Sequence, residues 1–238
     1  MTNTPKFGRL YGIGVGPGDV DLLTVKAYRL LQNVPVIGVP KRNARAQSYA
    51  YSIVKGLTRP NQEILELIFP MTKDVDLLQS HWESAADAIF QRLLLGKDVA
   101  FITEGDPFLY STFTYLFNLF REKYPDVSID VVPGISSING AAASAMLPLV
   151  YGDRQLAITP ATCGIQKLRD TLEGFDTVVL LKVNSVFDDV FELLDELNLV
   201  DKSVFVSRCT SPDEMIVHDI RKLRGRKLDY LSLLIIRK

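Results

Sequence analysis

The chain has 238 residues, 47% of them hydrophobic and 23% charged, which is typical of a globular protein with one large domain or two small ones. Its 27 Lys and Arg residues nearly balance 28 Asp and Glu, which argues against a broad nucleic-acid-binding surface and favours a small-molecule partner. The two distant cysteines suggest neither a disulfide framework nor a zinc site. No signal peptide or run of about 18 apolar residues is present, so we expect a cytoplasmic protein without a membrane span.

In the first half of the chain, short β-branched runs alternate with longer stretches of helical spacing, which is typical of an α/β domain. The expected strands span residues 9–15, 34–39, 64–69, 98–102 and 128–132. After the first strand, Asp19 can cap a helix whose apolar residues face a sheet. Two further helices are expected at about residues 77–95 and 111–123.

The second half continues this alternation with less regular spacing. Its expected strands span residues 155–159, 177–183, 203–208 and 230–237. A turn at Tyr124-Pro125-Asp126 separates the halves. We therefore predict two α/β domains, one over residues 1–126 and one over residues 127–238.

The first candidate site is the glycine-rich segment Gly12-Ile13-Gly14-Val15-Gly16-Pro17-Gly18-Asp19, at the predicted end of the first strand. Glycines there let the backbone approach a ligand closely. The dinucleotide pattern GxGxxG is broken, because Asp19 stands at the third glycine and Pro17 removes an N–H donor for a phosphate. We favour a cofactor without phosphates, with a tight turn capped by Asp19 as the alternative.

Two more loops follow predicted strands. The loop from Thr103 to Ser111 lies where open parallel sheets bind ligands, and its Asp106 can hydrogen-bond a cofactor or act as a base, unless it serves only a chain reversal. The segment Val132-Pro133-Gly134-Ile135-Ser136-Ser137 suits a helix start packed against a ligand or against neighbouring backbone. A hydrolytic serine is disfavoured, because neither histidine of the chain has a triad-like context.

Several cations lie in loops or at strand ends, where they are either solvated or bind a polycarboxylate ligand, since guanidinium groups pair with carboxylates. They are Lys41, Arg42, Arg45, Arg154, Lys182 and Arg208.

Taken together, GVGPGD, EGDPFLYS and VPGISS resemble, in order and spacing, the signature segments of the tetrapyrrole (corrin/porphyrin) methylases. The resemblance implies two α/β domains with an active-site cleft between them, a homodimer, and S-adenosylmethionine as the methyl donor, leaving S-adenosylhomocysteine. The segments YSTF, FPMT and LLTVKA are similar to the branch of this porphyrin-related family that methylates precorrin-2, or cobalt-factor II, at ring carbon 20 in cobalamin biosynthesis. That reaction needs no metal from the protein.

The resemblance assigns the donor contacts, and the catalytic and substrate-binding candidates also rest on the loop and cation arguments above. The catalytic candidates are Asp106 and Tyr110. The donor-binding candidates are Pro17, Glu104, Gly105, Asp106, Leu109, Ser136, Ser137, Lys182, Cys209 and Ser232. The substrate-binding candidates are Gly16, Lys41, Arg42, Ser111 and Thr112.

Four alternatives remain at this point. Diphthine synthases share the glycine motif and the LLTxKA helix, but YSTF weighs against them. Uroporphyrinogen III methyltransferases usually carry a GDPFVFGRG-like segment, from which this chain departs. The broken GxGxxG disfavours a dinucleotide-dependent oxidoreductase, and a non-catalytic binding module predicts no methyl transfer at all.

Overall fold

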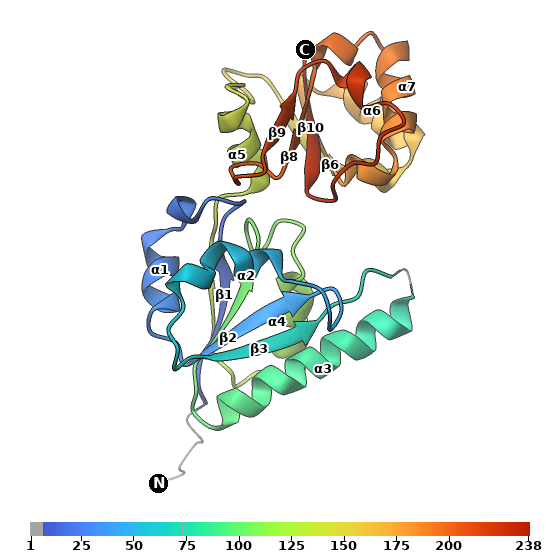
Figure 1. Ribbon diagram of the computed structural model, residues 1–238. Coiled ribbons are helices and arrows are strands. Elements are labelled where there is room, and N and C mark those ends of the chain that lie inside the picture. The colour runs from blue at the N-terminus through green and yellow to red at the C-terminus, as the bar shows by residue number, and fades with distance from the viewer. Residues whose placement is uncertain (1–6, 73) are drawn as a thin grey trace. The chain divides into compact units, whose positions relative to one another are not determined.

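The computed structural model describes residues 7–72 and 74–238, which form two compact units, each built on its own five-stranded sheet (Figure 1). The first unit ends at Ser136 and the second comprises Ser137–Lys238. The division expected after residue 126 therefore lies farther along the chain, because β5 (Ile129–Val132) pairs with β1 (Leu10–Gly14) in the first sheet. Among the described residues, no helix combines the length and the hydropathy that a bilayer crossing requires.

The first unit holds a fully parallel sheet in the order β3-β2-β4-β1-β5. All five predicted strands and both predicted long helices are present, with ends shifted by a few residues. Besides β1 and β5, its elements are β2 (Val36–Lys41), β3 (Glu63–Ile68), β4 (Val99–Thr103), α1 (Val25–Leu31), α2 (Tyr49–Val54), α3 (Val75–Leu94) and α4 (Phe113–Lys123).

Helices cover both faces of this sheet, which explains why β4 is buried along its whole length and apolar from Val99 to Ile102. Phe101 of β4 packs with α3 and α4 on one face, where it meets Phe113. Ile102, the next residue, belongs to the core cluster on the other face, which also contains Ala27 of α1 and residues of α2. Alternate side chains of a strand point to opposite faces, so burial on both faces requires a continuous apolar run.

The helix after β1 starts later than predicted. Asp19 caps only a short 3-10 helix at Val20–Leu22, with its Oδ1 atom accepting a hydrogen bond of 2.9 Å from the Asp21 N–H. The α-helix begins at Val25 and is capped by Thr24, whose Oγ1 accepts from the Ala27 N–H at 3.2 Å. The apolar spacing in the sequence fits one continuous helix, but Asp19 and Thr24 cap two separate ones, a 3-10 helix and α1.

The second unit holds a mixed sheet in the order β6-β7-β10-β8-β9, with β10 antiparallel to both of its neighbours. Helices α6 and α7 pack on one face and α5 on the other. The four predicted strands are present, but β9 was missed because three residues carry too little alternation. The elements are β6 (Leu156–Pro160), β7 (Thr177–Leu181), β8 (Ser203–Ser207), β9 (Met215–Val217), β10 (Ser232–Arg237), α5 (Ser137–Ser144), α6 (Ile165–Gly174) and α7 (Phe187–Glu196).

Candidate active site

The three loops singled out in the first half meet at one edge of the first sheet. Strands β4, β1 and β5 are neighbours and run parallel, so their carboxyl ends lie side by side (Figure 1). The β1 and β4 loops are also hydrogen-bonded to each other, with the Gly105 N–H donating to the Gly16 carbonyl at 2.8 Å. This edge is where open parallel sheets bind ligands.

Close contact between backbones explains several of the glycines. A Cβ atom on Gly134 would lie 2.2 Å from the Gly105 carbonyl oxygen, and one on Gly14 would lie 2.5 Å from the same oxygen. Neither position needs a positive φ, so the requirement is space alone. Gly16 differs, since its φ of 80° selects glycine, while a Cβ atom there would meet its neighbours only at ordinary contact distances of 3.7 Å or more. We call Gly14, Gly105 and Gly134 the glycine junction.

Asp106 joins two of these loops through its carboxylate. Its Oδ2 accepts a hydrogen bond of 3.1 Å from the Gly134 N–H in the β5 loop, and its Oδ1 accepts one of 2.9 Å from the Phe108 N–H in its own loop. Both oxygens therefore accept backbone hydrogen bonds. This geometry favours a positioning role for Asp106, and the base role considered for it from its place in the loop stays a prediction.

The two hydroxyl residues predicted to bind substrate lie at the start of α4. Ser111 is buried, its Oγ lies 3.0 Å from the Thr103 Oγ1 and it accepts from the Phe113 N–H at 3.1 Å. These contacts make Ser111 part of the helix start rather than a surface for substrate. Thr112 occupies the cap position of α4 without a side-chain capping bond and is partly exposed.

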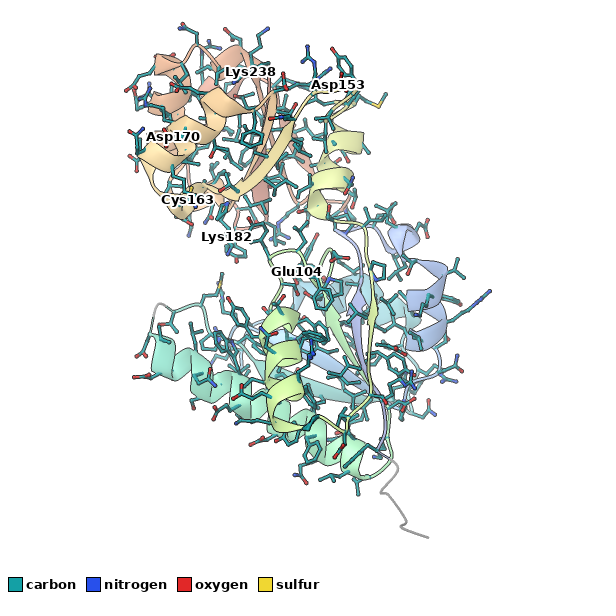
Figure 2. All side chains as sticks on the ribbon, turned by 180° about the vertical axis from the view of Figure 1, so that it is seen from behind. Glu104, Asp153, Cys163, Asp170, Lys182 and Lys238 are labelled. Atoms are coloured by element: carbon teal, nitrogen blue, oxygen red, sulfur yellow. The ribbon has the colours of Figure 1, made fainter. Side chains whose placement is uncertain are left out.

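The same loop presents other predicted residues to solvent. Glu104 is exposed (Figure 2), and Leu109 and Tyr110 are 37% and 51% exposed. Tyr110 also has a φ of 53°, a left-handed backbone that costs about 1–2 kcal/mol for a residue with a Cβ. Exposed side chains on a loop that Asp106 and the glycine junction fix in place are well situated to contact a ligand.

Two supports anchor this edge to α2 and β3. The Pro17 carbonyl accepts a hydrogen bond of 3.1 Å from the Tyr49 hydroxyl, which fixes the glycine-rich loop. Lys41, at the end of β2, pairs with Glu66 at 2.8 Å and donates to the Ala44 carbonyl at 3.0 Å, and only 10% of its side chain is exposed. In this geometry Lys41 supports its own loop, and the substrate role predicted for it stays a prediction.

The loop that Lys41 supports carries two exposed arginines, Arg42 and Arg45, which border a shallow hollow together with Asn43. Among the described residues, neither arginine forms an ion pair. The loop follows β2, whose carboxyl end shares the edge of the other parallel strands. Unpaired guanidinium groups at this edge are suited to carboxylates.

In the second unit, the remaining donor-binding candidates also come together at one sheet edge. Leu233 of β10 pairs with Leu181 of β7, so Lys182 follows the carboxyl end of β7 beside the start of β10 (Figure 2). Ser232 pairs with Ser207 of β8, two residues before Cys209. The Cys209 thiol donates to the Ser137 carbonyl at 3.5 Å. The structure thus brings Ser137, Lys182, Cys209 and Ser232 to one edge of this unit.

The loops at both of these sheet edges also contain residues with a left-handed backbone conformation. Among the described residues, six that are not glycine have a positive φ. Met146 and Asn198 follow α5 and α7. In both places the N–H of the next residue donates a hydrogen bond to a carbonyl five residues earlier, which is the usual way for a helix to end. The other four lie at the two edges just described, where strained backbone is often functional. They are Tyr110, Lys182, Arg208 and Thr210.

Cys209 should be an unreactive thiol. It is 5% exposed, and burial, reinforced by the charge of Glu214, raises its pKa to about 12. Because the thiolate is the nucleophile, Cys209 should resist iodoacetamide at pH 8, whereas the partly exposed Cys163 is labelled first. Peptide mass spectrometry of folded and urea-unfolded protein measures this. Labelling of Cys209 as fast in the folded chain as in the unfolded one would contradict the assigned burial.

The chain matches the sequence model of the Tetrapyrrole (Corrin/Porphyrin) Methylases over residues 9–223. It is 38% identical over 234 residues to the probable cobalt-precorrin-2 C(20)-methyltransferase of Methanocaldococcus jannaschii, a match that covers 97% of this chain and 96% of the relative. It is 32% identical over 232 residues to the cobalt-precorrin-2 C(20)-methyltransferase of Salmonella typhimurium, with 97% of each chain covered.

Solved structures with the same fold include the cobalt precorrin-4 methyltransferase CbiF, with a TM-score of 0.75, 25% identity, and 96% of this chain and 94% of that chain covered. The uroporphyrin-III C-methyltransferase of Thermus thermophilus, solved in complex with S-adenosylhomocysteine, gives a TM-score of 0.72 at 22% identity, with 97% and 98% covered. At that identity, the second likeness concerns the fold alone.

Proposed function

The chain belongs to the family of tetrapyrrole (corrin/porphyrin) methylases, and we propose that it is an S-adenosylmethionine-dependent methyltransferase that methylates precorrin-2, or its cobalt-containing counterpart, at ring carbon 20 in cobalamin biosynthesis. Two relatives named for carbon-20 methylation match it over nearly their whole lengths. We further propose a cytoplasmic homodimer, for which light scattering after size exclusion measures the mass.

The observation that carries the proposal is the joined set of three loops at the ends of β1, β4 and β5. The glycine junction brings the backbones together, and Asp106 locks the β5 loop to the β4 loop. Pro17 contributes no N–H, so the first loop has one donor fewer for a pyrophosphate than a dinucleotide site has, whereas S-adenosylmethionine has no phosphate to bind. The residues present therefore fit this methyl donor better than a dinucleotide.

When bound, the donor supplies a methyl group activated by its sulfonium. Carbon 20 of the ring forms the new C–C bond as the S–CH₃ bond breaks, and the ring carbon then loses its proton, leaving S-adenosylhomocysteine. The main contribution of the protein is alignment, which can supply roughly 7–11 kcal/mol. Asp106 and the glycine junction hold the loops, the exposed Tyr110 hydroxyl is suited to orienting the ring by a hydrogen bond, and the exposed Glu104 carboxylate is suited to accepting its proton.

One assay tests the function. Purified protein receives labelled S-adenosylmethionine with precorrin-2 or with cobalt-precorrin-2, and the product is analysed by mass spectrometry and by NMR for the methylated carbon. We expect one methyl group at carbon 20 in at least one of the two rings. No transfer to either ring, or transfer to a different carbon, overturns the assignment. Binding of NAD in preference to S-adenosylmethionine would instead favour the oxidoreductase alternative.

Tyr110→Gly should separate stability from activity. Glycine removes the left-handed strain of Tyr110, so the free energy of unfolding should rise by up to about 1 kcal/mol. Methyl transfer should nevertheless fall about 100-fold, because a side chain that contacts the ring is lost. Urea unfolding and initial rates measure the two effects, and Tyr110→Phe, which keeps the ring of the side chain, reports on the hydroxyl alone. A fully active glycine variant would remove Tyr110 from the site.

Arg42→Gln should weaken binding of the tetrapyrrole but not of the donor. Loss of one guanidinium–carboxylate pair should raise the KM for the ring about tenfold, which corresponds to ~1.4 kcal/mol. The KM for S-adenosylmethionine should stay constant. Arg59→Gln is the matched control, because Arg59 is also exposed but precedes β3, at the opposite end of the sheet. If both substitutions raise the KM for the ring equally, the effect is a general influence of charge and Arg42 does not bind the ring.

A further inference from the structure

Asp229 links two segments at the active edge of the second sheet. Its Oδ2 accepts a hydrogen bond of 2.8 Å from Arg208 Nε, and its Oδ1 accepts one of 2.8 Å from the Leu231 N–H. Its own carbonyl accepts from the Ser232 hydroxyl at 2.7 Å. One residue thereby connects the chain leaving β8 with the chain entering β10. With 30% of its side chain exposed, the carboxylate is partly shielded from water.

The segment leaving β8 requires such support. Arg208 and Thr210 have φ values of 47° and 63°, and Cys209 lies between them. Left-handed conformations of residues with a Cβ persist only where the surroundings hold them. Here the Arg208 N–H donates to the Leu231 carbonyl at 2.8 Å, and the Thr210 N–H donates to Glu214 Oε1 at 2.6 Å. Asp229 adds the side-chain contact that ties this turn to Leu231.

Two of the four donor-binding candidates at this edge, Cys209 and Ser232, have side chains that are committed to the protein itself. The Cys209 thiol donates to the Ser137 carbonyl, and the Ser232 hydroxyl donates to the Asp229 carbonyl. These two residues are 5% and 7% exposed. What they can offer a ligand is therefore their backbone, and the position of that backbone depends on the network around Asp229.

We propose that Asp229 is a positioning residue for methyl-donor binding, which fixes the backbone at Arg208–Thr210 and at Leu231–Ser232. The inference rests on the proposed function, since it takes S-adenosylmethionine as the ligand of this edge. Asp229 itself is not a catalytic residue, because it acts through the segments that it holds.

Asp229→Asn removes the charge and one of the two acceptor oxygens while keeping the size of the side chain. Loss of one such supporting bond should weaken S-adenosylhomocysteine binding and raise the KM for S-adenosylmethionine, each about tenfold, which corresponds to ~1.4 kcal/mol. The kcat at saturating donor should change less than about threefold, because the ring-binding loops belong to the first unit. Calorimetry and initial rates measure these quantities on the full chain.

Asp201→Asn is the matched control, because Asp201 also pairs with an arginine of this unit, Arg221 at 2.7 Å, but in an exposed position.

Arg208→Lys is the second test, since lysine keeps the charge and the backbone bond but lacks the Nε donor. This substitution should also weaken binding of the methyl donor. If Asp229→Asn lowers the melting temperature, its effect on donor binding can reflect lost stability, and the donor affinity of Arg208→Lys then tests the positioning role. Donor affinity equal to wild type in both variants overturns the positioning role alone. A wild-type protein that binds neither S-adenosylmethionine nor S-adenosylhomocysteine overturns the proposed function and the inference with it.

Discussion

Asp106→Asn should reduce methyl transfer by about 100-fold, because displacement of reacting groups by about 1 Å has an effect of that size. The asparagine side chain has one acceptor oxygen and one NH₂ group. Either the Gly134 N–H or the Phe108 N–H must then face another donor, whereas the carboxylate accepts from both. The loss of one hydrogen bond to a charged acceptor should also lower the free energy of unfolding by about 1.5–3 kcal/mol.

The pH dependence of kcat distinguishes positioning from proton transfer. If Asp106 only positions the loops, the profile of Asp106→Asn keeps its shape at a lower level. If Asp106 is the general base, the acidic limb of the profile disappears. Asp126→Asn serves as the control, since Asp126 is an exposed carboxylate of the same unit. A variant with wild-type rate and stability would exclude both roles.

Gly134→Ala should be the most disruptive single-methyl change at the site. The new Cβ would lie 2.2 Å from the Gly105 carbonyl oxygen and 2.9 Å from the Gly14 backbone, and these atoms belong to neighbouring strand ends that cannot rotate away. Separation of the loops should cost about 3 kcal/mol of unfolding free energy, at the upper end for overpacking. Methyl transfer should fall by about 100-fold or more.

Gly56→Ala provides the control for this substitution. Gly56 belongs to the same unit, has no atom within 4 Å of its Cβ position and does not need a positive φ. Its replacement should change the free energy of unfolding by less than about 0.5 kcal/mol. Urea unfolding of the two variants gives the comparison. If Gly134→Ala is as stable and active as Gly56→Ala, the glycine junction does not constrain the site.

The strands and the three loops could be predicted from sequence because apolar runs end in glycine or Asp-Pro segments, and ligand loops follow strands in α/β folds. The adjacency of β4, β1 and β5 could not, since sheet order depends on contacts between distant segments. The bond from the Gly134 N–H to Asp106 is of this kind, as is the pairing of Lys41 with Glu66. These two contacts give a candidate base and a candidate substrate ligand supporting roles that their places in the sequence do not indicate.

Backbone strain was also beyond sequence reasoning. Glycine marks a left-handed position in a sequence, but Tyr110 and Lys182 adopt that conformation without any signature in their side chains. The family resemblance had named both residues, and their backbone conformation gives that assignment a physical reason. Arg208 and Thr210 show the same strain around Cys209 and were not among the donor-binding candidates. The contacts of Asp229 join this turn to β10, which no spacing in the sequence indicates.

The first-unit site has a frame that is separate from the surface it presents. The glycine junction and Asp106 contact each other and hold the β4 loop in place. Glu104, Leu109 and Tyr110 are the exposed residues of that loop. A lineage can therefore explore new ring specificities at the exposed positions while the frame stays invariant. Directed evolution toward other tetrapyrroles should accordingly randomise the exposed side chains first, because most substitutions there leave folding intact.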